Sequence, residues 1–572
     1  MKSANQLDLA IMAIYMFAMV SIGFIFMRFN KGASDYFKGG NRIPWLVAGL
    51  SCFMSGFSAW TFTGAAGIAY RHGIVIALLY LGNGVTFLVG YFVFAQRWRR
   101  TRISTTMAYL VERFDETTRQ TFSVATVFFQ LFMGASMLYG LSLMVASTCG
   151  FPILWTIAAS GFMVLVYCML GGLWAVVAAD FLQAVILMPF CLVLMGSALI
   201  RVGGLSGLYY SLPPQMVSLH LRGEFGWMFV ACWTMMNMVG YNSGVMAQRY
   251  FSVDNEDSAK KVALLCAFLF FVGSFIWFIP PMAMRVVYPD VAKVFPGFVN
   301  PHETAFAAAA LTLLPNGLIG IMLAAMFSSA MANLSGMFNL HAAILSKDVF
   351  QTLFAPHAGE RAMLRIGRVM TACVATTVTI LAVALACAGK SIFSVLVTFA
   401  SLMAIAYGPA ALLGLLIKRT PHWSGMASFM VGLTLGAVGT FVLGWGLVMT
   451  FVVAAPAAAA AFLGTRWFDS SEPRYAEPRE RLFLRLATPI DVNRELTGSV
   501  DQTTPVFRFL SRATAAIGMI ALLLLFTVPA SGRGAVVAYS AITLAVAAGL
   551  AFIRGEKKHK GSAQPPATDR VT

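Results

Sequence analysis

Hydroxyl-bearing residues and glycines interrupt an apolar segment near the start of the chain, Gly49–Tyr70. The segment is long enough to cross a lipid bilayer, which takes about 20 helical residues. Its interior nevertheless holds small and hydroxylated residues that weaken a continuous helix: Ser55, Gly56, Ser58, Thr61, Thr63, Gly64 and Gly67. Irregular backbone survives at membrane depth only where it lines a protein-buried or water-filled cavity. We therefore expect this helix to break around a bound ion and a solute.

A second set of oxygen ligands lies within residues 320–350. Ala325, Ser328 and Ser329 stand at positions i, i+3 and i+4, so they share one face of a helix. Two hydroxyls and a backbone carbonyl can coordinate a small hard cation without adding charge. The alternative is structural, because small residues on one face also let membrane helices pack closely.

A second apolar segment, Gly226–Arg249, is also interrupted. The polar and small residues within it are Asn237, Gly240, Tyr241, Asn242, Ser243 and Gly244. Two interrupted helices at corresponding places of two halves indicate a binding site near the membrane midplane. Interhelical packing by the glycines and asparagines is the alternative interpretation.

Asp180 is the carboxylate that the sequence places inside a central membrane helix. An ionisable group at that depth is costly and suggests a function. We expect Asp180 to bind a cation transiently on its exit route to the cytoplasm. The alternative is that Asp180 is a solvated residue at the end of its helix. Gln130, on another apolar span, is a weaker polar candidate.

Composition places the chain in a membrane. Of 572 residues, 59% are hydrophobic and 11% charged, and the mean hydropathy is +0.78; a soluble domain has about 25% charged residues. We predict an all-α polytopic protein with fifteen spans, at residues 7–27, 44–67, 74–96, 121–148, 152–170, 174–200, 226–247, 262–284, 316–345, 369–388, 391–417, 424–445, 448–465, 510–529 and 535–553. No nucleophile–base pair or metal motif points to an enzyme, and no cofactor is expected.

The net charge of +17 does not indicate a nucleic-acid partner, because the basic residues gather in alternate loops. The positive-inside rule makes these loops cytoplasmic. They are residues 28–42, 97–119, 248–261 (with Arg249) and 346–368. The N-terminus is then outside and the basic C-terminal tail cytoplasmic, in a plasma membrane, most simply a bacterial inner membrane.

Four motifs, in order along the chain, resemble the sodium:solute symporter family. They are the DYF-KGG-N-R-PW segment (Asp35–Trp45), GFSAWTFTGAAGIAYRHG (Gly56–Gly73), GGLWAVVAADFLQ (Gly171–Gln183) and AAMFSSAMANLSGMFNLHAAILSKDVF (Ala324–Phe350). The resemblance extends from the first span to about residue 465. It implies a five-plus-five inverted-repeat transporter fold with one extra N-terminal and about four extra C-terminal helices.

The implied boundaries are an N-terminal helix and cytoplasmic loop (1–42), two repeats (43–201 and 225–419), additional helices (420–466), a cytoplasmic linker (467–508), two final helices (509–554) and a disordered tail (555–572). The resemblance also implies a sodium site formed by Met54, Phe57, Ala325, Ser328 and Ser329. Asp180 corresponds to the family's inner-route aspartate, although Ala179 replaces the usual threonine.

The solute is less defined. Sugar carriers of the family have glutamine where this chain has Thr61, and proline carriers have aspartate where it has Gly56. Because we find no charged residue on the broken helices, we expect a small neutral or zwitterionic solute, with a monocarboxylate still open. The candidate ligands are Ser55, Ser58, Thr61, Gln130, Asn237, Tyr241 and Asn242. We predict sodium-coupled import by alternating access; a proton-coupled symporter of the same fold and a transporter-derived nutrient sensor are the alternatives.

Overall fold

The computed structural model describes residues 4–27, 43–57, 59–103, 106–168, 173–221, 223–351, 360–468, 472–495 and 503–553. Secondary structure in these ranges is helical throughout. Ten helices are long and apolar enough to cross a membrane, and a bent pair, Trp45–Ser55 with Ala59–His72, makes an eleventh. Each of the fifteen predicted spans coincides with one helix or with consecutive helical pieces. The predicted all-α membrane fold is confirmed.

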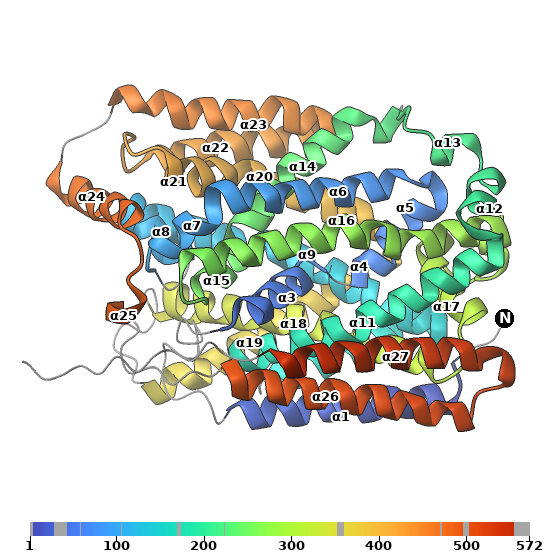
Figure 1. Cartoon of the computed structure of the whole chain (residues 1–572). Helices are drawn as coiled ribbons and strands as arrows, with labels where there is room; N and C mark the ends of the chain where they lie inside the picture. The colour runs from blue at the N-terminus through green and yellow to red at the C-terminus, as the bar shows by residue number, and fades with distance from the viewer. Residues whose placement is uncertain are drawn as a thin grey trace, which may run out of the picture.

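The first half of the chain contains the first broken helix together with longer continuous helices (Figure 1). Its elements are α1 (Gln6–Met27), α3 (Trp45–Ser55), α4 (Ala59–Phe62), α5 (Gly64–His72), α6 (Val75–Val89), the π-helical η2 (Gly90–Phe94), α7 (Ala95–Arg100), α8 (Thr106–Arg113), α9 (Glu116–Cys149), α10 (Ile153–Cys168) and α11 (Leu173–Val202).

The second half contains another interrupted helix and the helix with the predicted ion-site hydroxyls. Its elements are α12 (Gly204–Ser211), α13 (Pro214–Val217), η3 (Gly223–Phe225), α14 (Trp227–Asn242), α15 (Gly244–Phe251), α16 (Glu256–Val287), η4 (Val291–Lys293), η5 (Pro301–Thr304), α17 (Ala305–Leu313), α18 (Leu318–Ala343), η6 (Ile344–Gln351), α19 (Glu360–Cys387), α20 (Ile392–Gly408), η7 (Pro409–Leu413) and α21 (Gly414–Leu416).

The remaining helices flank this core on two sides. One pair, α22 (Ser424–Ala437) with η8 (Val438–Val442) and α23 (Leu447–Gly464), packs on α20. After η9 (Thr465–Phe468), α24 (Pro473–Ala487) and α25 (Val492–Glu495) lie at the end of the molecule where α7, α8 and α15 meet (Figure 1). The hairpin of α26 (Thr503–Leu523), η10 (Leu524–Phe526) and α27 (Ala530–Phe552) packs on α11.

The first predicted break is present between α3 and α4, whose helical parts meet at an angle of 57°. The α3 ladder closes with short turns, in which the Gly56 N–H donates to Cys52 and Phe53 and the Phe57 N–H donates to Met54. The second interruption lies at Ser243, in extended backbone, followed by Gly244 at φ +58°. This left-handed conformation favours glycine. Asn237 and Gly240, which the sequence included in the interruption, remain within the regular helix α14.

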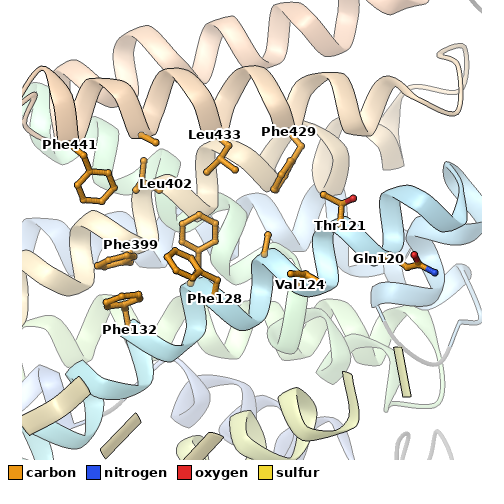
Figure 2. A pocket seen from close by; sticks show the side chains of 13 residues that line it. Gln120, Thr121, Val124, Phe128, Phe132, Phe399, Leu402, Phe429, Leu433 and Phe441 are labelled. Atoms are coloured by element: carbon orange, nitrogen blue, oxygen red, sulfur yellow. The ribbon is translucent and has the colours of Figure 1, made fainter. Parts of the chain in front are cut away.

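A lateral groove of about 1010 Å³ separates α9 from α20 and α22. Figure 2 shows it lined by Phe128, Phe132, Phe399, Phe429 and Phe441, with Gln120 and Thr121 at one end. The Phe132 and Phe399 rings stack with centroids 4.0 Å apart. This groove lies apart from the broken helices and is lined almost wholly by apolar side chains.

Candidate functional site

The carbonyl side of the predicted ion site lies where α3 ends. Asn333 of α18 donates its side-chain amide to the carbonyl oxygens of Phe57 at 3.1 Å and Met54 at 3.4 Å. Ala325, about two turns earlier on α18, is fully buried. The structure therefore brings the break in the first helix against α18.

Two parts of the prediction fall outside this description. Ser328 and Ser329 lie within the helix α18, but their side chains lie outside the part of the chain that the structure describes. Ser58 lies outside the described residues altogether. The sodium ligands Met54, Phe57, Ala325, Ser328 and Ser329 remain a prediction.

The start of α18 is fixed by Asp8 of α1. This buried carboxylate accepts hydrogen bonds from the Gly317 N–H at 2.5 Å, the Gly320 N–H at 2.9 Å and the Asn316 amide at 2.8 Å. These backbone groups belong to the first turn of a helix and have no intrahelical partner, and the helix dipole favours a negative charge there. A Cβ at Gly320 would lie 2.6 Å from the Asp8 carbonyl oxygen, so glycine permits this close approach.

Asp180 lies in a buried ion pair on the α3 side of the break. Its Oδ2 accepts a hydrogen bond from the Ser51 hydroxyl at 2.6 Å and lies 3.5 Å from Nη2 of Arg249. The Arg249 Nε donates to the same Ser51 oxygen at 2.9 Å, and Nη2 lies 3.4 Å from the Ser55 hydroxyl. Asp180 is 2% exposed, so the alternative of a solvated helix-end residue is wrong.

This cluster also corrects the expectation that the broken helices carry no charge. Arg249 belongs to α15, the second piece of the second broken helix, and is 3% exposed. The sequence assigned it to a cytoplasmic loop because it follows an apolar run among other basic residues. Its partner Asp180 balances the charge, which a buried guanidinium requires.

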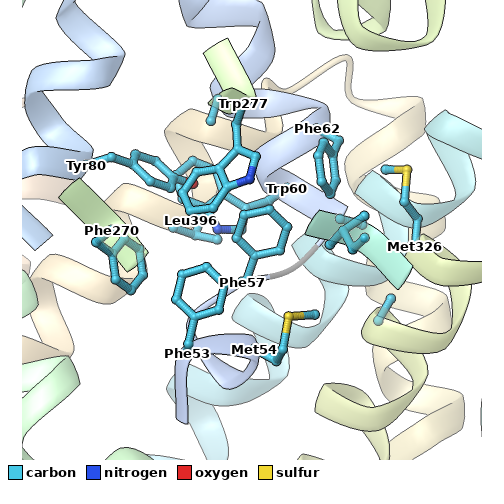
Figure 3. Close-up of a cluster of buried hydrophobic side chains, with 14 of the residues drawn as sticks. Phe53, Met54, Phe57, Trp60, Phe62, Tyr80, Phe270, Trp277, Met326 and Leu396 are labelled. Atoms are coloured by element: carbon cyan, nitrogen blue, oxygen red, sulfur yellow. The ribbon is translucent and has the colours of Figure 1, made fainter. Parts of the chain in front are cut away.

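An aromatic cluster fills the space around α4. Figure 3 shows Trp60, Tyr80, Phe57, Phe270 and Trp277 converging on the broken helix. The Trp60 ring lies 6.0 Å from Trp233 and 5.9 Å from Tyr80, measured between centroids. Flat aromatic faces near a few polar groups are typical of small-molecule sites.

Two of the predicted solute ligands lie within or beside this cluster. The Thr61 hydroxyl is hydrogen-bonded to the Tyr80 hydroxyl at 2.9 Å. Tyr241 stacks on Phe87, and the Asn83 amide lies 3.4 Å from the Tyr241 hydroxyl. Tyr80 and Asn83, together with Trp233, were not singled out from the sequence. The available signal for Tyr80 and Asn83 was that they are polar residues at spacing i, i+3 on an apolar helix.

The other predicted ligands are used elsewhere. The Ser55 hydroxyl donates to the Ser51 carbonyl within α3. The Asn237 amide donates to Trp233 within its own helix. The Asn242 amide donates to Thr86 of α6 at 3.1 Å. Gln130 lies half-buried on α9. The structure therefore does not gather all the predicted solute ligands in one place.

A buried carboxylate marks the opposite end of the site. Glu303 of η5 accepts hydrogen bonds through Oε1 from the Ser391 hydroxyl at 2.8 Å and the Ile392 N–H at 3.1 Å, so it caps the start of α20. Its Oε2 has no hydrogen-bond partner among the described residues. Burial raises the pKa of Glu303 to about 7. The Cα and Cγ of Glu303 also lie close to Gly67 of α5, so this residue joins the broken helix to α20.

Comparison with known proteins shows similarity to carriers. The chain is 26% identical to rat sodium/glucose cotransporter 2 over 477 residues, covering 76% of this chain and 71% of the rat protein. It is 26% identical to mouse sodium/myo-inositol cotransporter 2 over 491 residues, covering 80% and 72%. The sodium/sialic acid symporter NanT of Aliivibrio fischeri is 25% identical over 385 residues, covering 65% and 75%.

The fold is shared with a solved carrier. The structure of a Na⁺-coupled sialic acid symporter in a substrate-bound outward-open state superposes with a TM-score of 0.68 at 20% identity, covering 82% of this chain and 98% of the other. The sodium:solute symporter family model matches residues 36–432. This match takes in the predicted ion-site residues, the Asp180–Arg249 pair and both broken helices. The chain belongs to the sodium:solute symporter family.

Proposed function

We propose that this protein is a sodium-coupled symporter that imports a small polar solute by alternating access. The observation that carries the proposal is the contact between α18 and the Met54 and Phe57 carbonyls at the break. A cation bound there, with the Ala325 carbonyl and the Ser328 and Ser329 hydroxyls, would join the two pieces of the first broken helix to α18. Sodium binding would then stabilise the arrangement of the broken helix that accepts solute.

Asp180 and Arg249 form the inner barrier in this proposal. Ser51 of α3, Asp180 of α11 and Arg249 of α15 tie three elements together on the inner side of the site. Inward opening must separate these elements and thus break the ion pair. A departing sodium ion can take the place of the guanidinium beside Asp180, which keeps the carboxylate compensated and gives the cation a route to the cytoplasm.

The solute is proposed to be neutral overall and rich in hydroxyl groups. Trp60, Trp233 and Tyr80 supply flat faces, and the Thr61–Tyr80 hydroxyl pair with Asn83 supplies donors and acceptors. Arg249 does not provide a site for an anion, because its charge is already paired with Asp180. The relatives that carry glucose and myo-inositol are consistent with such a solute; sialic acid, the acidic alternative, is carried by another relative.

The proposed setting is a plasma membrane, with the C-terminus and the α24–α25 segment in the cytoplasm. The inward sodium gradient and the membrane potential drive uptake, and the potential contributes about 2.3 kcal/mol per charge per 100 mV. Proton coupling through Asp180 is the second candidate, because this carboxylate is buried and accepts a hydrogen bond from Ser51 of α3, the helix that ends at the break.

A thermal-shift screen of sugars, polyols, amino acids and monocarboxylates, in sodium against potassium, selects the solute. Its uptake into proteoliposomes is then measured with an inward sodium gradient, with a proton gradient and with neither. Sodium-driven uptake that is lost in Ser328→Ala/Ser329→Ala supports the proposal. Uptake that ignores sodium and persists in that variant contradicts it, and proton-driven uptake abolished in Asp180→Asn establishes the second candidate.

A further inference from the structure

Asn333 occupies a position that the proposed coupling ion must share. Its Nδ2 lies 3.1 Å from the Phe57 oxygen and 3.4 Å from the Met54 oxygen, the two carbonyls predicted to face sodium. Both neighbours are hydrogen-bond acceptors, so the amide must present its N–H groups there, because its oxygen would be repelled. The amide thus offers these carbonyls partial positive charge, as a cation would.

The contact also joins the break to α18, as a bound ion would. Phe57 lies beyond the last turn of α3, where the helical ladder of hydrogen bonds stops. A hydrogen bond to a buried carbonyl contributes about 0.5–1.5 kcal/mol. Through Asn333 the break remains joined to α18, 276 positions away in sequence. The amide therefore joins the two sides of the proposed ion site by a contact within the protein.

We infer that Asn333 is an internal substitute for the coupling ion, which sodium displaces when it binds between the Met54 and Phe57 carbonyls and α18. The inference rests on the proposed sodium site. The amide stabilises the ion-free protein and so lowers the apparent affinity for sodium. Such a competitor lets the site empty toward the cytoplasm, where sodium must leave, while the two carbonyls keep a donor from α18.

The test is a sodium titration of the purified Asn333→Leu and Asn333→Ala variants, in which the melting temperature is measured at each sodium concentration. Choline chloride replaces sodium chloride so that the ionic strength stays constant. Removing the amide leaves the ion-free carbonyls without this donor and leaves the ion-bound state unchanged. The half-saturating sodium concentration should fall by about threefold or more, and the melting temperature should depend more steeply on sodium. Asn300→Leu is the matched control, since its amide also donates to a distant carbonyl, that of Gly389, and its sodium titration should match the wild type.

Asn333→Thr provides a second variant if the apolar changes prevent folding, because its shorter side chain does not reach the two carbonyls as the amide does. Its half-saturating sodium concentration should also fall. A higher half-saturating sodium concentration in Asn333→Leu or Asn333→Ala would indicate that the amide oxygen is a sodium ligand and would overturn the inference. An unchanged concentration would also overturn it, because Asn333 would then contribute only to packing. If the wild type shows no sodium-specific shift at all, the proposed function fails as well; a sodium shift in the wild type that the variants leave unaltered defeats this inference alone.

Discussion

At the scale of residues, two buried carboxylates of this protein are compensated by groups on distant elements. Asp180 is balanced by Arg249, and Asp8 by the amides at the start of α18. Asn333 plays a similar part for a carbonyl: its neutral side-chain amide donates a hydrogen bond to the Phe57 oxygen. Each of these contacts joins elements that lie far apart in sequence and that surround the broken helix. The polar groups therefore determine where the pieces of the site sit.

Because Asp180 and Arg249 form a buried ion pair, we predict that replacing Asp180 alone lowers the stability and that replacing both residues restores most of it. Asp180→Asn leaves the buried guanidinium without a counter-charge, which costs about 3–5 kcal/mol and should lower the melting temperature in detergent. Adding Arg249→Met removes the unpaired charge, so the double variant should regain most of the stability while uptake stays impaired. If Asp180→Asn alone melts like the wild type, the pair does not hold the inner barrier.

Glu303 predicts a dependence of stability on pH. Burial raises its pKa from 4.5 to about 7 in the folded protein, so the folded state holds a proton that the unfolded state releases. Its stabilising contribution is complete below pH 4.5 and is lost as the pH rises toward 7. Glu303→Gln keeps an acceptor for Ser391 and Ile392 but does not ionise. Melting temperatures between pH 4.5 and 8 should therefore fall less in the variant, and parallel curves would contradict this account.

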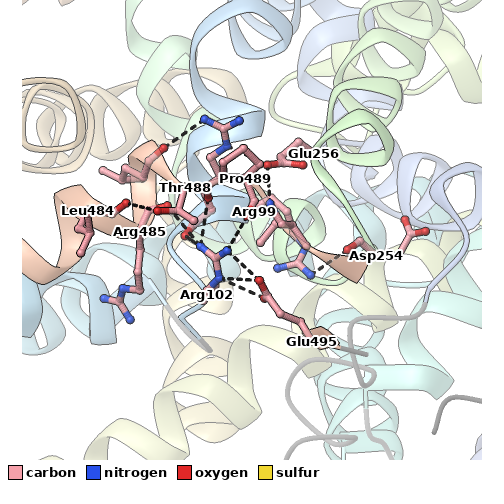
Figure 4. Close-up of polar contacts among 12 residues, drawn as sticks. Arg99, Arg102, Asp254, Glu256, Leu484, Arg485, Thr488, Pro489 and Glu495 are labelled. Carbon is pink, nitrogen blue, oxygen red and sulfur yellow. Dashed lines mark hydrogen bonds and ion pairs between the residues drawn. The ribbon is translucent and has the colours of Figure 1, made fainter. Parts of the chain in front are cut away.

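At the scale of elements, α24 and α25 form a strap across one end of the molecule. At this end α7 ends, and α8 and α16 begin. Arg102, between α7 and α8, contacts Glu495 at 2.8 Å and the Pro489 carbonyl at 3.0 Å. Arg100 pairs with Glu256 at 2.8 Å, and Glu256 also accepts from the Ile490 N–H. Figure 4 shows the contacts around Arg102, with Glu495, Pro489 and Glu256 labelled. The strap thus bridges the start of α16 and the α7–α8 connection.

Arg102→Ala should loosen this strap without unfolding the transmembrane core. The loss of several partly exposed hydrogen bonds is worth about 1–2 kcal/mol, so amides of residues 473–495 should exchange with deuterium about tenfold faster. The exposed Arg481 provides the matched control, and Arg481→Ala should leave exchange unchanged. Equal exchange in Arg102→Ala and the wild type would show that the strap is held by other contacts.

The helices could be predicted from the sequence, but the contacts among them could not. Apolar runs longer than a bilayer crossing fix where helices lie, and clustered Ser, Gly and Thr residues indicated the break after Ser55. The second break was placed less well: Asn237 and Gly240 continue the helix, and the interruption needs the extended Ser243 and left-handed Gly244. Nothing in the sequence pairs Arg249 with Ser51, 198 positions away, because hydropathy does not encode which polar groups meet.

At the scale of the whole molecule, the family's shared fold surrounds the proposed ion site and the proposed solute site, which adjoin. The break in the first helix faces α18 on one side and the aromatic cluster on the other. The helices α26 and α27 lie outside this arrangement, on α11, and the strap lies at one end (Figure 1). Movement of the broken helices against α18 and α11 would therefore alter ion, solute and inner barrier together.

The account depends most on a cation binding between the break and α18. Equilibrium binding of radioactive sodium to the purified protein tests this without knowledge of the solute. We predict saturable binding that is lost in Ser328→Ala/Ser329→Ala and retained in Ser428→Ala, a buried serine of α22 whose hydroxyl bonds within its own helix. Absence of saturable sodium binding, or equal binding in the double variant and the wild type, would contradict it.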